Sequence, residues 1–265
     1  VIKKLKKLLE DPSVKKIGQN IKFDFIVFYK NGITLSSMED TMLMSYVLDA
    51  GKNRHNMDTL SEIHLGHKTV SFKDIVGTGK KEINFSDVEL EKAKDYAAED
   101  ADVTLRLYKK FIKNLKNEKM INIYEIFEKP LIKILAFMEI EGVEIDSKFL
   151  KSLSSKFEKK IQKLEKEVFK ISKKEFNIAS PKQLGEIIYN DLKIAGLKKT
   201  KKGSFATSAS VLEDLAFKGH EFPKLILDWR QVSKLKNTYS DALPEHLNPN
   251  TKRVHTSFLL AATTT

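Results

Sequence analysis

The chain has 265 residues, of which 41% are hydrophobic, so it is long enough to form one large domain or two ordinary ones. Lys and Arg outnumber Asp and Glu by 47 to 36, and the resulting net charge of +11 favours a polyanionic partner such as nucleic acid over an acidic small molecule. The absence of cysteine excludes disulfides, thiolate nucleophiles and cysteine-ligated zinc.

No apolar run in the sequence approaches the roughly 18–20 residues of a membrane span, and no signal peptide opens it. We therefore expect a cytoplasmic protein that has no membrane partner. The sequence begins inside a predicted helix and stops just after a strand-like run, so we also expect a fragment of a longer protein.

The first half alternates short strand patterns with helix patterns, which indicates an α/β layer. Helices are predicted over 1–9, 23–29, 41–48 and 59–65, and short strands over 14–20 and 33–35. Asp40 is the predicted cap of the third helix, and Asn56 or Asp58 that of the fourth.

A loop and a long helix complete this half. Gly77 and Gly79 mark a loop over 73–81. Ser86, followed three residues later by Glu89, has the capping-box spacing and predicts the start of a helix that continues to about Leu115.

The second half is predicted to be mainly helical. It begins after a polar stretch at 116–120, the predicted domain boundary, and its helix patterns cover 125–139, 150–171, 181–192 and 223–239, with another helix opening near Ser210 and a closing strand over 253–260. The helix over 150–171 carries a narrow apolar stripe that predicts pairing with an antiparallel helix of the same chain.

Tyr96 and Asp100 are the first candidates for chemistry. Their spacing of four residues puts both side chains on one face of the long helix, where a phenol and a carboxylate can address one hydrated divalent metal. Asp24, Asp40 and Asp102 are further carboxylates near element ends, and hydrolysis by two metals needs several such oxygen ligands. Spacing alone fits a solvated helix face as well, because the chain has 36 acidic residues.

The pair belongs to a series of four short segments that occur in a fixed order: 18–24 (GQNIKFD), 40–43 (DTML), 54–58 (RHNMD) and 96–102 (YAAEDAD). In order and spacing they resemble the proofreading 3′→5′ exonuclease domain of the bacterial family A DNA polymerases. The resemblance implies a ribonuclease H-like α/β fold in which two Mg²⁺ or Mn²⁺ ions activate water. It further implies that Asp24 and Asp100 are metal ligands and that Tyr96 orients the attacking water.

The same resemblance implies a binding site for the frayed single-stranded 3′ end of DNA. The residues that would grip or stack this end are Gln19, Asn20, Phe23, Arg54 and Phe72. Phe23 stands where the family commonly has tyrosine. The family's first exonuclease motif, Asp-x-Glu, belongs upstream of Val1, so we expect this piece alone to be nearly inactive as a nuclease.

Segments of the second half resemble the thumb of the same polymerases, at 139–146, 176–184, 207–208, 234–239 and 253–256. The thumb grips the backbone of the primer–template duplex, and hydroxyls at a helix start with nearby lysines suit phosphates. The duplex-binding residues implied are Asn177, Ser180, Lys198, Lys199, Lys201, Lys202, Thr207, Ser208, Lys234, Lys236 and Asn237.

The sequence thus predicts two parts of a DNA polymerase of replication and repair: a partial ribonuclease H-like exonuclease domain over 1–118 and a mainly α-helical thumb region over 119–265. The palm, with the polymerase carboxylates, would follow Thr265, so this piece cannot transfer nucleotides. We expect a monomer that binds DNA. Two alternatives are a stand-alone exonuclease related to ribonuclease D and a catalytically inactive exonuclease scaffold that only binds DNA.

Overall fold

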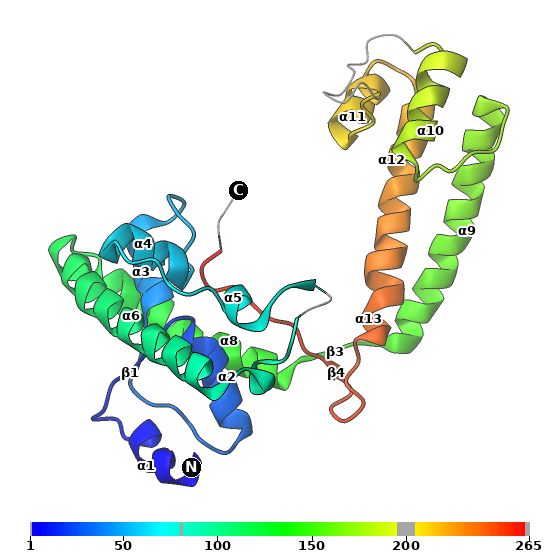
Figure 1. The fold of residues 1–265 in the computed structure, drawn as a ribbon. Coiled ribbons are helices and arrows are strands. Elements are labelled where there is room, and N and C mark those ends of the chain that lie inside the picture. Colours follow the sequence, from blue (N-terminus) through cyan, green and yellow to red (C-terminus); the bar gives the residue numbers. More distant parts are fainter. Residues whose placement is uncertain (1, 80–81, 195–204, 263–265) are drawn as a thin grey trace. The chain divides into compact units, whose positions relative to one another are not determined.

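The structure, a computed structural model, describes residues 2–79, 82–194 and 205–262. It divides into two compact units, Val1–Gly142 with Thr256–Thr265, and Val143–His255 (Figure 1). The first unit is mixed α/β and the second mainly helical, as predicted. The units divide after Gly142, whereas the predicted domain boundary follows residue 118, because the helix at Lys129–Glu141 packs into the first unit through Ile132 and Ala136.

The first unit contains a sheet of two parallel strands, β1 (Lys16–Gly18) and β2 (Met38–Asp40), with Lys16 opposite Met38 and Gly18 opposite Asp40. The helix α2 (Ile21–Lys30) connects them. The strand predicted over 33–35 is wrong. Ile33 and Leu35 are buried, but the backbone pairs with β1 only further along the chain, at β2.

The other helices of this unit are α1 (Ile2–Glu10), α3 (Thr41–Asp49), α4 (Met57–Leu65), α5 (Phe72–Val76), α6 (Leu90–Asn117), α7 (Ile121–Ile123), the π-helix η3 (Tyr124–Glu128) and α8 (Lys129–Glu141). Val103, Leu107, Phe111 and Leu115 form one buried face of α6 at four-residue spacing. The capping box predicted for this helix is wrong. Ser86 lies in a short 3₁₀ turn (Phe85–Asp87), and α6 begins after Glu89.

The second unit contains α9 (Ser147–Ser172), α10 (Pro181–Glu186), η4 (Ile187–Asp191), α11 (Ala209–Phe217), α12 (Glu221–Lys234), η5 (Leu235–Asp241) and α13 (Ala242–Glu245). The long helix α9 lies beside α12 and η5 in antiparallel orientation (Figure 1). Its stripe residues Ile161, Leu164 and Val168 are buried in the core of this unit, which confirms the predicted pairing within the chain.

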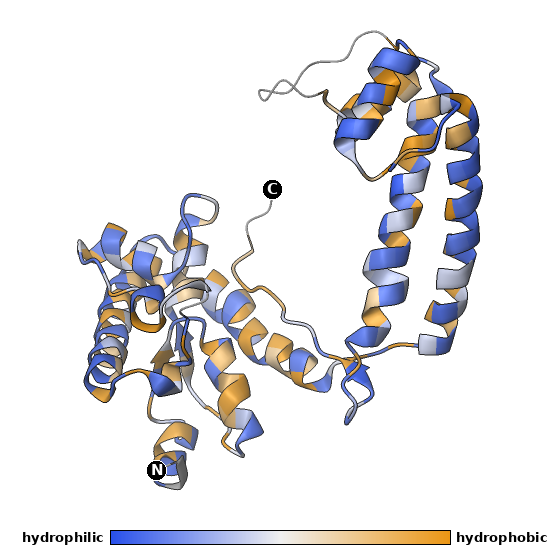
Figure 2. Ribbon diagram, turned by 45° about the vertical axis from the view of Figure 1, so that its right-hand side comes forward, coloured by the Kyte–Doolittle hydropathy of each residue, from blue (hydrophilic) through white to orange (hydrophobic). Residues whose placement is uncertain are grey.

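Hydrophobic and hydrophilic residues alternate along α9 and α12, as expected for helices with one buried face (Figure 2). A short antiparallel ladder joins β3 (Val143–Glu144) to β4 (Arg253–Val254). The closing strand predicted over 253–260 therefore exists only at its first two residues. In the part of the chain that the structure describes, we find no helix with the length and apolarity needed to cross a membrane.

Candidate functional site

Tyr96 and Asp100 lie on one face of α6, as their spacing predicts. The Tyr96 hydroxyl lies close enough to the Asp100 carboxylate to lower its pKa. Burial, together with the negative charge of Asp100, raises the pKa of Tyr96 to about 12. Burial also raises the pKa of Asp100, and its Oδ1 atom is buried without a hydrogen-bond partner. The pair therefore combines a neutral phenol with a carboxylate oxygen that is free to take a ligand.

Asp24 lies in the first turn of α2, where it lines a cavity of about 250 Å³ beside Gly18 and Ile21. Asp24 is exposed as a whole residue, while partial burial of its carboxyl raises the pKa, and neither Tyr96 nor Asp100 contributes to that shift. The charges of Asp58, on α4, and of Glu99, on α6, instead act on both Tyr96 and Asp100. The sequence motifs did not indicate that Asp58 lies near Tyr96 and Asp100.

The resemblance implies a two-metal site to which this chain contributes only some of the carboxylates. Among residues 2–79, 82–194 and 205–262, no group of three or more His, Asp or Glu side chains could hold a metal ion. Asp24 and Asp100 therefore lack the additional carboxylates that a pair of Mg²⁺ or Mn²⁺ ions requires. No hydrolytic step follows from the residues present.

Asp40, another carboxylate singled out by sequence, has a structural role. It is fully buried and accepts backbone N–H groups from Asn20 (3.0 Å), Ile21 (3.0 Å) and Met42 (2.9 Å). It thereby binds the first turns of both α2 and α3, which confirms the predicted cap of α3. Burial raises its pKa to about 6 in spite of these donors. Asp102 is exposed and forms an ion pair with Arg106, at 3.4 Å.

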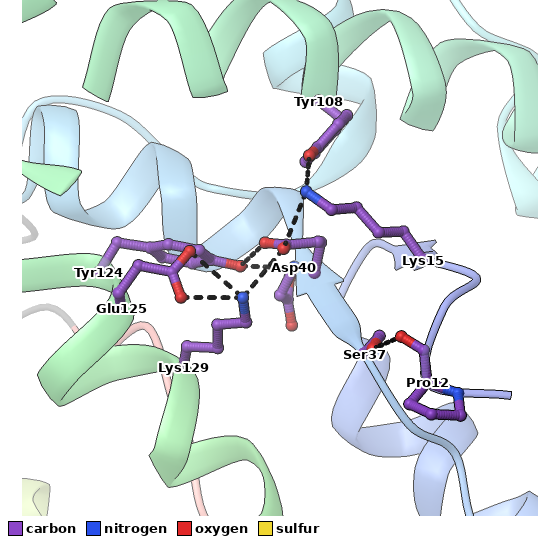
Figure 3. A network of polar contacts seen from close by, with 9 residues as sticks. Pro12, Lys15, Ser37, Asp40, Tyr108, Tyr124, Glu125 and Lys129 are labelled. Atoms are coloured by element: carbon purple, nitrogen blue, oxygen red, sulfur yellow. Dashed lines mark hydrogen bonds and ion pairs between the residues drawn. The ribbon is translucent and has the colours of Figure 1, made fainter. Parts of the chain in front are cut away.

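A polar network surrounds the neighbouring residue Glu39, and sequence reasoning missed it (Figure 3). The buried Glu39 carboxylate accepts the Tyr124 hydroxyl at 3.0 Å and Lys129 Nζ at 2.9 Å, and Lys15 Nζ lies 3.6 Å away. The Tyr124 oxygen also accepts the Asp40 N–H, at 3.0 Å. Burial raises the pKa of Tyr124, so it stays a neutral donor. The network connects β2 to the segment η3–α8.

The residues predicted to grip single-stranded DNA fall into two groups. Gln19 is tied to the fold, because its amide donates to the His55 carbonyl at 2.7 Å and accepts the Thr41 hydroxyl. Asn20 holds a left-handed conformation (φ 56°) at the start of α2. Phe23, with 67% of its surface exposed, and the exposed Arg54 are available for a ligand.

Phe72 lies next to Tyr96 in a cluster of three aromatic rings. Its ring centroid is 5.9 Å from that of Phe85 and 6.1 Å from that of Tyr96, and Phe85 lies 6.0 Å from Tyr96. Phe72 and Phe85 are 48% and 40% exposed. Sequence reasoning missed Phe85, because it falls between the motifs and only the fold brings it to Phe72.

In the second unit, four residues predicted to bind duplex DNA meet at one cavity of about 570 Å³: Thr207, Ser208, Lys234 and Asn237. Arg230 lines the same cavity and donates to the Thr207 carbonyl at 2.7 Å, a contact that sequence reasoning missed. A basic cavity with hydroxyls at the start of α11 suits a phosphate.

The remaining duplex-binding candidates are placed differently. Lys236 forms ion pairs with Asp241 (2.7 Å) and Glu158 (3.5 Å). Ser180 caps α10 through the Gln183 N–H, and the Asn177 side chain accepts the Ala179 N–H at 3.0 Å, so both order the turn next to the cavity. Lys198, Lys199, Lys201 and Lys202 lie outside the described residues.

Comparison with known proteins matches both halves of the chain. Residues 1–116 match the family model for 3′-5′ exonuclease, and residues 147–265 that for DNA polymerase family A. The chain is 49% identical to DNA polymerase I of Rhizobium leguminosarum and 42% identical to DNA polymerase I of Pseudomonas aeruginosa, with 99% and 100% of this chain covered. It spans only 26% and 30% of those two relatives.

Among solved structures, the POL domain of Pol1 from M. smegmatis, in complex with DNA primer-template and dNTP, is similar, with a TM-score of 0.76 at 26% identity. The match covers 96% of this chain and 41% of that one.

Proposed function

Because the chain belongs to the family A DNA polymerases, we propose that it contributes the proofreading exonuclease domain and the DNA-binding thumb of a DNA-directed DNA polymerase that acts in replication and repair. In this proposal the first unit has the ribonuclease H-like fold of such exonucleases. The second unit grips the primer–template. The polymerase reaction itself belongs to parts of the relatives that this chain does not span.

One observation carries the exonuclease part of the proposal. Asp100 keeps a buried oxygen without a partner next to the Tyr96 hydroxyl, within the segment that matches the exonuclease model. A buried carboxylate oxygen left unpaired is costly unless a ligand takes it. We propose Asp100 and Asp24 as metal ligands of the complete enzyme and Tyr96 as the residue that orients water. Further carboxylates must come from outside the described residues.

The exonuclease proposal is tested by digestion of a single-stranded oligonucleotide with Mn²⁺ present. We expect this 265-residue chain to be nearly inactive, because its carboxylates do not complete a metal site. Digestion that Asp100→Ala abolishes would show that the residues present suffice and would contradict the expectation. Asp102→Ala is the matched control, because Asp102 is exposed two residues further along α6.

The thumb proposal is supported by the cavity that gathers Thr207, Ser208, Lys234 and Asn237. Lys234 and Lys236 offer a matched pair, since Lys236 is held in two ion pairs and Lys234 in none among the residues that the structure describes. We expect Lys234→Ala to reduce the slope of log Kd against log salt for duplex DNA by about 0.9, the value for one phosphate contact, and Lys236→Ala to change it less. Unchanged slopes for Lys234→Ala would reject a phosphate contact at the cavity.

The basic segment 198–202 gives a second, larger test of the thumb. Replacement of Lys198, Lys199, Lys201 and Lys202 together should reduce the same slope by up to about 0.9 for each phosphate that the segment neutralises. An unchanged slope would remove this segment from the proposed duplex grip.

The inactive scaffold remains the second candidate for the first unit, and the lack of a complete carboxylate group among the described residues favours it. The two candidates differ in the complete enzyme. If the unit proofreads, the complete enzyme removes a mismatched 3′ end and Asp100→Ala abolishes this activity. If the unit is a scaffold, the complete enzyme does not remove the mismatched end.

A further inference from the structure

The segment between α4 and α5 is fastened to α6 by a residue next to Asp100 in the chain. Glu99 Oε1 lies 2.7 Å from His67 Nε2, and Glu99 Oε2 accepts the Val70 N–H at 2.8 Å. The Glu99 side chain is 20% exposed. Glu99 is therefore a largely buried acceptor that contacts two groups of the same segment.

The same segment is tied on its other side to α4. The Thr69 hydroxyl donates to Asp58 Oδ1 at 2.7 Å. Residues 67–70 are thus held between two carboxylates, Glu99 and Asp58, both of which also act on Tyr96 and Asp100 through their charge. Neither carboxylate has a place in the motif-based account of the site.

The position of the aromatic rings depends on this segment. Phe72 begins α5 only two residues after Val70, and its ring stacks on Phe85 at a centroid distance of 5.9 Å with an angle of 26° between the ring planes. Both rings lie about 6 Å from Tyr96 and keep close to half of their surface exposed. Two exposed, stacked rings beside the candidate site form a surface on which unpaired bases can stack.

We propose that Glu99 is a positioning residue for single-strand binding. It fastens residues 67–70 to α6, and thereby holds the stacked pair Phe72–Phe85 beside Tyr96, where the pair receives the bases of a frayed 3′ end. Phe85 is the second ring of this platform. This inference rests on the exonuclease function proposed above, and it assigns a role to Glu99 and Phe85, to which the motif resemblance gave none.

The test is a cycle in which a protein side chain and a DNA base are removed in turn. The affinity of the whole chain for a labelled single-stranded oligonucleotide is measured by fluorescence anisotropy, and again with abasic sites at the last three 3′ positions. Glu99→Ala should weaken binding of the normal oligonucleotide about tenfold, the scale of one base stacked on an aromatic ring, and binding of the abasic one less than about twofold. Phe85→Ala should behave in the same way.

Glu99→Gln is the matched control, because the glutamine oxygen can still accept the Val70 N–H. It should bind within about twofold of the unmodified chain. Hydrogen exchange reports the structural step separately: the Val70 amide should exchange faster in Glu99→Ala and little faster in Glu99→Gln, while amides in the buried half of α6 stay protected.

Three outcomes would overturn the inference. If Phe72→Ala weakens binding and Glu99→Ala does not, the positioning role is wrong and the proposed function stands. If Glu99→Ala weakens normal and abasic oligonucleotides equally, its effect does not pass through base stacking. If the unmodified chain fails to bind the normal oligonucleotide, the proposed function fails, and the positioning role fails with it.

Discussion

Asp40 and Asp100 are carboxylates of the same unit, and they differ in how many hydrogen bonds they accept. Asp40 receives three backbone N–H groups, and its neighbour Glu39 receives Tyr124 and Lys129. Asp100 lies beside Tyr96, and one of its carboxylate oxygens is buried without a hydrogen-bond partner. Both residues were singled out in the sequence as carboxylates that could serve a metal site, so residue type does not separate them.

The difference shows how to separate a structural carboxylate from a functional one. A carboxylate whose acceptor sites are filled by the protein stabilises the fold and has no capacity left for a ligand. A carboxylate with an unfilled site costs stability in the free protein, and such a cost is typical of functional sites. Free energies of unfolding of matched variants measure this contrast.

The largest effect is expected for Asp40→Ala. It leaves three N–H groups without an acceptor at the starts of α2 and α3, so the free energy of unfolding should fall by about 3 kcal/mol in urea titrations at pH 7. Asp102→Ala, which removes one exposed ion pair, should change it by less than about 0.5 kcal/mol. Similar losses for the two variants would mean that Asp40 does not fasten the two helices.

A smaller effect separates the two tyrosines. Tyr124→Phe removes the hydroxyl that donates to Glu39 and accepts from the Asp40 N–H, so the free energy of unfolding should fall by about 2 kcal/mol. Tyr96→Phe removes only the contact with Asp100 and should change stability by less than about 0.5 kcal/mol. A larger loss for Tyr96→Phe would make its hydroxyl part of the structural framework.

The smallest effect is expected for Asp100→Asn, and it has the opposite sign. Because burial raises the pKa of Asp100 in the folded state, its ionised form costs stability at neutral pH. The variant should be as stable as the unmodified chain or more stable, by less than about 1 kcal/mol at pH 7. This difference should shrink as the pH falls from the raised folded-state pKa to the unfolded value of about 4, and it should vanish below that value, where both states are protonated. A variant that is less stable at pH 7 would contradict the functional role.

Local patterns sufficed for most helices, because burial of one helix face repeats every three or four residues. The stripe of α9 and the face of α6 are examples. They did not suffice for β2, where Ile33 and Leu35 have the alternation of a strand but the ladder forms at Met38–Asp40. The choice between these segments depends on the partner strand, which a local pattern does not include.

Some residues of the candidate site could be predicted from local patterns and others could not. The proximity of Tyr96 and Asp100 follows from helix geometry within one element, and the sequence was enough to predict it. Asp58, Phe85 and Glu99 take their positions from contacts between separate elements, so no spacing rule could have found them. Lys236 shows the opposite case: the motif predicts a DNA contact for it, but its side chain forms ion pairs with residues of the same unit.

The course of the chain has a further consequence. It leaves the first unit after Gly142 and re-enters it at Thr256, and within the second unit the entering strand β3 pairs with the leaving strand β4. The re-entering segment is then held by Glu139, which accepts the Phe258 N–H at 2.7 Å, and by Lys22, which donates to the Phe258 carbonyl. The second unit is thus an insertion with adjacent ends, which a short turn could replace while the first unit remains one continuous folding unit.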